Sequence, residues 1–150
     1  MNFDTATHRR LEPLSQEECM ERLASQSIGR LGFVDEDGPI VLPVNYRLDR
    51  GTVIVRTAPG AKLDAAARRD VVAFEVDDVD PGTDEPWSVL VRGRAAQMWT
   101  PGEVGAAQAL GLRPAAGAGV GEQQYIRIDP HTVTGRRIPR EFTLAPVWLG

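Results

Sequence analysis

Alternation of apolar and polar residues is the main pattern along this chain, and it predicts strands. Within 43–48, Val44, Tyr46 and Leu48 alternate with polar residues, and after the turn LDRG the segment 52–57 is again rich in β-branched residues. A period of two on both sides of an Asp/Gly turn is typical of a β-hairpin. The same pattern predicts strands at 28–34, 39–48, 52–57, 71–77, 87–96 and 124–129, with 132–138 extending or pairing with the last.

Consecutive strands separated by short turns favour an antiparallel sheet. A parallel doubly wound sheet needs a helix between each pair of strands, and this sequence does not supply them. Closing an antiparallel sheet removes its exposed edges. We therefore expect a single domain over 1–150 that is mainly β, with six strands in a closed or nearly closed barrel.

Helices are predicted at three places between these strands. Ser15 and Glu18 have the spacing of a capping box, which starts a helix that runs to about Ser25. The stretch LDAAARRD (63–70) predicts a short helix, and Thr100-Pro101 opens another. Gly29 and Gly32, inside the first strand, indicate a bend or the close approach of another backbone.

Four segments are expected to be irregular or peripheral. Residues 1–13 are polar and predicted to lie loosely on the surface, and the Gly/Ala-rich segment 111–122 is expected to be a flexible loop. The acidic segment 77–86 does not have the ligand spacing of an EF-hand and predicts a solvated turn. The apolar residues of 141–150 are expected to pack on the body or on a partner chain.

Composition narrows the function classes. A net charge of −4 and an isoelectric point near 5.2 argue against a nucleic-acid-binding protein. The sequence has no apolar run of membrane-spanning length and its start does not resemble a signal peptide, so we expect no membrane association and a cytoplasmic location. Cys19 is the single cysteine, and His8 and His131 are the two histidines. No metal site is expected, and any catalysis is expected to rely on a cofactor.

The end of the second hairpin strand carries the candidate chemistry. Arg56 and Thr57 are followed by the turn Ala58–Ala61 and then by Lys62, the only lysine among 17 basic residues. A guanidinium, a hydroxyl, turn amides and an ammonium within seven residues suit a phosphate ester, whose oxygens accept several charge-assisted hydrogen bonds. A surface turn with two solvated cations is the alternative that spacing alone leaves open.

With these motifs in view, the chain resembles the pyridoxamine 5′-phosphate oxidase-like, FMN-binding split-barrel family, and within it the actinobacterial, nitroimidazole-resistance-type branch. The resemblance covers about residues 14–138. It is carried by GRLGFV (29–34), LPVNY (42–46), VIVRTAPGAKL (53–63), VAFEVD (72–77), WSVLVRGRA (87–95) and TGRRI (134–138).

The resemblance implies a homodimer of six-stranded split barrels with a flavin at each end of the subunit interface. Arg56 and Lys62 would hold the flavin phosphate, with help from Thr57 and the amides around Ala61. The remaining site residues it implies are Pro43, Val44, Asn45 and Tyr46 along the flavin ring, Trp87 and Ser88 from the partner subunit, and Arg136 near the ring or substrate, where a solvated strand end is the alternative.

Three functions remain after this comparison. The first is an FMN-dependent oxidoreductase acting on a small, electron-poor organic substrate. The second is a reductase on the same fold that uses the deazaflavin coenzyme, which a basic track leading away from the site would favour. The third is a non-catalytic flavin- or haem-binding protein, with His131 as a possible axial ligand. The acidic net charge favours FMN. The C-terminal arginine motif of the oxidase itself has no match in FTLAPVWLG, so that specific activity is not expected.

Overall fold

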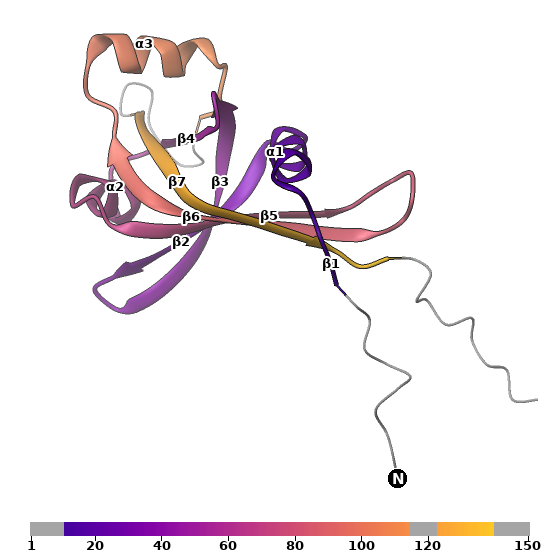
Figure 1. The fold of residues 1–150 in the computed structure, drawn as a ribbon. Coiled ribbons are helices and arrows are strands. Elements are labelled where there is room, and N and C mark those ends of the chain that lie inside the picture. Colours follow the sequence, from indigo (N-terminus) through magenta and orange to yellow (C-terminus); the bar gives the residue numbers. More distant parts are fainter. Residues whose placement is uncertain (1–10, 115–122, 140–150) are drawn as a thin grey trace, which may run out of the picture.

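The computed structural model describes residues 11–114 and 123–139 (Figure 1). Strands dominate, and three short helices lie between them. Their bounds are β1 (Glu12–Pro13), α1 (Gln16–Ala24), β2 (Ile28–Asp35), β3 (Gly38–Asp49), β4 (Thr52–Thr57), α2 (Ala61–Ala67), β5 (Val71–Val79), β6 (Pro86–Gln97), α3 (Pro101–Ala109) and β7 (Gln124–Arg137).

The strands form one antiparallel sheet that closes into a barrel. Their order is β1-β7-β4-β3-β2-β5-β6, and an additional pairing of β6 with β7 completes the ring. Six strands, β2 to β7, therefore make the barrel, as the sequence predicts. Past the ring, β5, β6 and β7 continue together as an arm beneath α1 (Figure 1).

Alternating side chains of the strands fill the barrel. On β3, Val44 and Tyr46 are buried, whereas Pro43 and Arg47 are exposed. The Tyr46 ring packs edge-on against Phe74 of β5 with 4.8 Å between centroids, and its hydroxyl donates a hydrogen bond to the Leu23 carbonyl of α1. This bond joins the first helix to the core, because an unpaired buried hydroxyl would be costly.

Two glycines allow close approaches that any side chain would block. A Cβ at Gly29 would collide with the Phe74 ring, so the group that approaches β2 most closely here is a side chain, with the Glu75 carbonyl oxygen next at 3.2 Å. A Cβ at Gly93 would collide with the Asp129 carbonyl of β7. At this point the β6–β7 register shifts, since Arg92 pairs with Thr132 but Gly93 pairs with Pro130. The segments predicted at 124–129 and 132–138 thus form one strand, β7, with a bulge between them. The bulge accommodates Pro130, which has no N–H to donate to the sheet.

Both outer helices begin as capping boxes. The Glu18 amide donates to Ser15 Oγ at 3.1 Å and the Ser15 amide to Glu18 Oε1 at 3.2 Å, which confirms the predicted start of α1. Thr100 and Glu103 repeat this arrangement at α3. Helix α2 lies at 61–67 rather than 63–70: it begins straight after Gly60 and ends before Arg69, whose φ of 57° is not helical.

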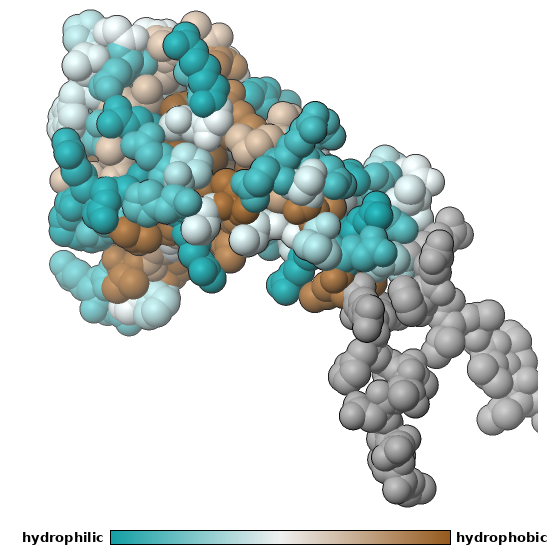
Figure 2. Space-filling model, in the orientation of Figure 1, coloured by the Kyte–Doolittle hydropathy of each residue, from teal (hydrophilic) through white to brown (hydrophobic). Residues whose placement is uncertain are grey.

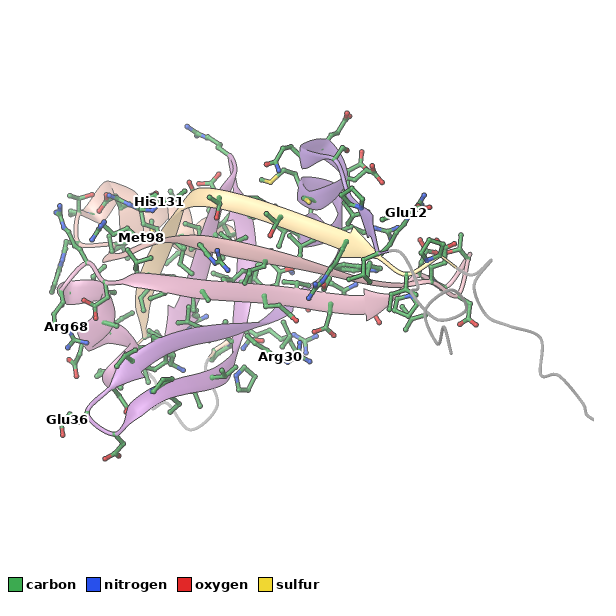
Figure 3. All side chains as sticks on the ribbon, turned by 60° about the horizontal axis from the view of Figure 1, so that its bottom comes forward. Glu12, Arg30, Glu36, Arg68, Met98 and His131 are labelled. Carbon is green, nitrogen blue, oxygen red and sulfur yellow. The ribbon has the colours of Figure 1, made fainter. Side chains whose placement is uncertain are left out.

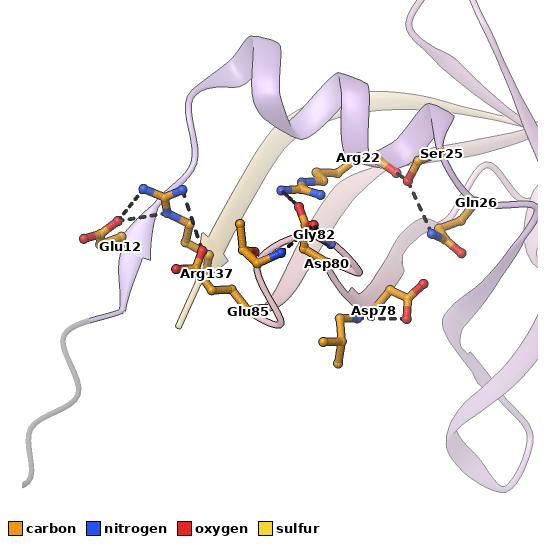
Figure 4. Close-up of polar contacts among 11 residues, drawn as sticks. Glu12, Arg22, Ser25, Gln26, Asp78, Asp80, Gly82, Glu85 and Arg137 are labelled. Carbon is orange, nitrogen blue, oxygen red and sulfur yellow. Dashed lines mark hydrogen bonds and ion pairs between the residues drawn. The ribbon is translucent and has the colours of Figure 1, made fainter. Parts of the chain in front are cut away.

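The N-terminal part of the described chain is held more firmly than expected. Glu12–Pro13 pairs with the end of β7 as β1, and the Glu12 carboxylate accepts from Arg137 at 2.7 and 2.8 Å (Figure 4). The turn after β5 is ordered around Asp80, which accepts from the Gly82 amide and pairs with Arg22 at 2.9 Å. The other predictions were a loose N-terminal segment, a flexible loop and a packed C-terminal segment. They concern residues 1–10, 115–122 and 140–150, which lie outside the described residues.

Apolar side chains also reach the outer surface of the β2–β3 hairpin. Ile28, Val34 and Val41 are 61%, 59% and 64% exposed, and Figure 2 shows this brown area low on the barrel. None of the helices in the described part of the chain is both long and apolar enough to cross a bilayer.

Candidate functional site

A hollow of about 340 Å³ opens where β3, β4 and α2 meet. Most of the side chains predicted for the phosphate and ring of the ligand come together here. Its lining is Ile28, Leu42, Pro43, Val44, Asn45, Arg56 and Lys62. No acidic residue is among these lining residues, although the chain as a whole carries a net charge of −4.

Strand pairing explains why these distant residues share one place. Asn45 of β3 is directly opposite Arg56 of β4. Cross-strand neighbours project to the same face of an antiparallel pair, so the amide and the guanidinium lie on one side of the hairpin. Gly60 then turns the chain into α2, which places Lys62 next to the end of β4. The hairpin and the following turn are thus sufficient to gather the polar part of the site.

The Arg56 guanidinium is held in position by the chain itself. Its Nη1 donates to the Leu112 carbonyl at 2.7 Å, and its Nε donates to Gln123 Oε1 at 2.8 Å. The guanidinium carbon is also 5.9 Å from the centre of the Tyr125 ring. These contacts orient the group. Within the described part of the chain Nη2 forms no hydrogen bond, so one edge of the fork can meet a ligand.

Lys62 is the opposite case, a cation without a partner. Its side chain is half-buried, and within residues 11–114 and 123–139 its ammonium forms no hydrogen bond or ion pair. Burial lowers the pKa of Lys62 because it removes water from the charged form. A partly desolvated cation gains more from an incoming anion than an exposed one does. Lys62 is therefore a suitable group to bind an anion in this hollow.

Three other predicted residues face elsewhere. Thr57 is fully buried and its hydroxyl donates to the Ala58 carbonyl, so the hydroxyl does not line the hollow. Ala61 borders a neighbouring hollow instead. Tyr46 belongs to the core, where burial raises its pKa to about 12 and keeps the hydroxyl protonated. A role for these residues toward the ligand stays a prediction.

Trp87, Ser88 and Arg136 lie on another face of the same chain. Trp87 is buried beneath the Arg22 guanidinium, 5.3 Å from the ring centre. Ser88 and Arg136 are paired across β6 and β7, and both line a separate hollow of about 440 Å³ together with Glu75. Within one chain this hollow does not join the first, so their predicted contact with a flavin would require a second copy.

The comparison with known families decides the identity of this barrel. The model of the family described as pyridoxamine 5′-phosphate oxidase matches residues 15–137, most of the chain. The chain belongs to the pyridoxamine 5′-phosphate oxidase family. The resemblance drawn from the sequence motifs is thereby confirmed.

One relative and two solved structures match over 87% or more of their own length. An uncharacterized protein of Mycobacterium tuberculosis is 37% identical over 87% of each chain. A Corynebacterium glutamicum structure, provisionally named a pyridoxamine 5′-phosphate oxidase, is 35% identical with a TM-score of 0.75, over 87% of this chain and 99% of that one. The FAD binding protein of Mycobacterium smegmatis is 34% identical with a TM-score of 0.69, over 84% and 98%.

Sequence reasoning missed the contribution of the connection between α3 and β7. The Leu112 carbonyl binds Arg56, and the Pro114 carbonyl accepts from Asn45 Nδ2 at 3.4 Å. The Gly/Ala-rich composition after Gly111 predicted only a flexible loop. Backbone carbonyls carry no residue signature, so nothing in the sequence marked these two as part of this family member's site.

Proposed function

We propose that this protein is a flavin-dependent oxidoreductase that binds FMN through its ribityl phosphate in the hollow beside Lys62. The observation that carries the proposal is the half-buried Lys62, which has no partner among the described residues. It lies beside an oriented Arg56 in a hollow whose described lining contains no acidic residue. The volume of about 340 Å³ lies within the range of small-molecule sites, roughly 300–1,000 Å³. FAD binding by the Mycobacterium smegmatis relative supports the choice of a flavin.

The chain's own residues would bind and orient the cofactor. Lys62 and Arg56 would neutralise the phosphate, and Asn45 would offer a side-chain amide to the cofactor. Pro43, on the same exposed face of β3 as Asn45, would supply an apolar surface against which a planar ring can lie, and Val44 would contribute its backbone. A bound flavin supplies two-electron transfer between an electron donor and an acceptor. We propose a small, electron-poor organic acceptor as the substrate.

Spectral titration of the apo protein with FMN tests this proposal. Saturable binding is expected, and Lys62→Ala and Arg56→Ala should each weaken it by about 1.5–3 kcal/mol, the scale of a hydrogen bond to a charged group. Arg50→Ala is the matched control, because Arg50 is a highly exposed arginine outside the hollow. Unchanged FMN affinity in both site variants would show that the phosphate binds elsewhere. Bound flavin that no nitroaromatic or quinone acceptor reoxidises would reject the oxidoreductase.

We also propose that the working form is a homodimer. Ile28 lines the hollow and is 61% exposed, and Val41 on the paired strand is 64% exposed. Burying such apolar surface against a second copy would be favourable and would close the rim of the hollow. Sedimentation of wild-type protein and of Val41→Glu tests this proposal. A wild-type monomer that binds FMN at micromolar concentration would contradict it.

A further inference from the structure

The hollow of about 440 Å³ lies on the outer face of the sheet, where β5, β6 and β7 pair side by side. Val89 and Val91, which alternate with its lining residues on β6, are buried inside the barrel. The side chains that line it are those of Glu75, Ser88, Leu90, Arg92, Thr134 and Arg136. None of these described residues also lines the proposed flavin hollow, so the two are separate features of the chain.

Unpaired hydrogen-bond donors predominate in this outer hollow. The guanidinium groups of Arg92 and Arg136 form no hydrogen bond or ion pair with any residue that the structure describes, and both side chains are exposed. The hydroxyls of Ser88 and Thr134 form no hydrogen bond with those residues either. A guanidinium donates and never accepts. A ligand that satisfies these groups must therefore supply acceptors, and an anion supplies the strongest ones.

Opposite charges balance at the edge of the hollow that β5 forms. Arg30 of β2 donates to Glu75 at 3.2 Å and to Asp77 at 2.7 Å. Burial and the neighbouring Asp77 raise the pKa of Glu75 to about 7, although Arg30 opposes the shift. When Glu75 is protonated, Arg30 balances Asp77, and the charges of Arg92 on β6 and Arg136 on β7 remain unbalanced. The hollow then suits a ligand with two negative charges.

Strand pairing places the two arginines at opposite ends of the hollow. Arg136 is directly opposite Ser88, whereas Arg92 lies four residues further along β6. At a rise of roughly 3.3 Å per residue, about 13 Å separates these two positions along the strand. Leu90 and Thr134 are paired midway between them. A molecule with an anionic group at each end and a short apolar middle would therefore meet both guanidinium groups above Leu90.

We propose that this outer hollow binds a small dicarboxylate whose two carboxylates pair with Arg92 and Arg136. The Ser88 hydroxyl donates to the carboxylate at the Arg136 end, and the carbon chain lies on Leu90. A guanidinium can bind a carboxylate through two parallel hydrogen bonds. Two carboxylates match the two unbalanced charges, whereas two phosphate monoesters would bring about −3 to −4. One chain supplies all of these contacts, so the inference depends neither on a bound flavin nor on a second copy.

NMR titration of the full-length protein with succinate, glutarate and adipate tests this inference. Saturable shifts are expected at the backbone amides of Ser88 and Leu90. The variants Arg92→Gln and Arg136→Gln should each weaken binding by about fivefold, the upper end for an exposed ion pair. Arg50→Gln, which alters a highly exposed arginine outside the hollow, should bind the diacids as wild type does.

The pH dependence provides a second readout. Glutarate affinity should rise about threefold as the pH falls from about 8 to about 6, because ionised Glu75 repels the ligand and protonated Glu75 does not. Glu75→Gln keeps the shape of the side chain without its charge, so its glutarate affinity should be the same at both pH values. A pH dependence that persists in Glu75→Gln would contradict the part assigned to this carboxyl.

Three results would overturn the inference. Valerate, which replaces one carboxylate of glutarate with a methyl group, should bind more weakly, and equal affinity would rule out a ligand held at both ends. Unchanged glutarate affinity in both arginine variants, or no saturable shift with any diacid, would rule out the site. Shifts confined to amides near Lys62 would place the diacid in the flavin hollow instead. FMN binding is measured separately, so its failure would reject the proposed function and leave this inference standing.

Discussion

Helix α2 separates two hollows of opposite charge. On one side, Lys62 and Arg56 face a hollow of about 340 Å³ in which none of the lining residues that the structure describes is acidic. On the other, a larger hollow of about 550 Å³ contains Arg68 and five carboxylates, those of Asp35, Glu36, Asp37, Asp64 and Asp70. Figure 3 shows Glu36, at the tip of the β2–β3 hairpin, and Arg68, at the end of α2, on the same side of the molecule.

The volume of a hollow does not identify the ligand site of this protein. The acidic hollow is the larger one, yet Arg68 pairs with Asp70 at 2.9 Å and both side chains are substantially exposed. Across the described residues, no three His, Cys, Asp or Glu side chains are placed to hold a metal ion together. Water can solvate the carboxylates of the acidic hollow, whereas the half-buried Lys62 is less fully solvated. An anionic ligand would therefore gain more in the smaller hollow, where it would neutralise a poorly solvated cation.

The largest effect on FMN affinity is expected from Lys62→Glu, which reverses the charge of this side chain in the basic hollow. Lys62→Glu removes the ammonium and puts a carboxylate next to the ligand's phosphate, so FMN affinity should fall by more than about 100-fold, beyond the loss in Lys62→Ala. Isothermal titration would measure it, and unfolding curves would show that the variant folds. A loss no larger than that of Lys62→Ala would mean that the phosphate lies far from this side chain.

A rise in pH is expected to lower flavin affinity less than Lys62→Glu does. Because burial lowers the pKa of Lys62, the ammonium loses its proton at a lower pH than an ordinary lysine does. Flavin affinity should then fall by about tenfold as the pH rises through that value. The stability of the apo protein should change in the opposite direction: the unfolded chain binds more protons in this range, so stability rises with pH.

Lys62→Arg is the control for this prediction. A guanidinium stays charged throughout the accessible pH range, so FMN affinity of the variant should be flat where that of the wild type declines. Titrations from pH 7 up to the ordinary lysine pKa of about 10.4 would reveal the difference. Parallel declines in both proteins would assign the pH dependence to a group other than Lys62.

The basic hollow was predictable from the sequence because its parts are local. Alternation on β3 and the turn after β4 place Asn45, Arg56 and Lys62 together whatever the rest of the barrel does. The closed barrel was predictable for a similar reason, since six strand patterns with short turns leave few other arrangements. Family motifs added the expectation of a flavin, which alternation alone could not give.

Contacts that depend on distant packing were not predictable. The Leu112 carbonyl reaches Arg56 because Leu112 packs with Ile54 and Tyr125 in the small core beside α3. Trp87 begins a strand that the motifs assign to the site, yet in the single chain it is buried under Arg22. Neither fact has a local signal, because each is set by which face of a strand another element covers.

The smallest effect is expected on the acidic side of α2. Asp64 is two residues from Lys62, but it lines the other hollow. Asp64→Asn keeps the shape of the side chain and removes its charge, and at 0.15 M salt charges separated by more than about 8 Å are largely screened across solvent. FMN affinity should therefore rise less than twofold, whereas Lys62→Gln, which removes one charge from the same helix, should lower it about tenfold. If Asp64→Asn instead raised the affinity tenfold, the two hollows would share one electrostatic field. The acidic hollow would then act to weaken flavin binding, and the charge difference between the two faces of α2 would be part of how the protein sets its affinity.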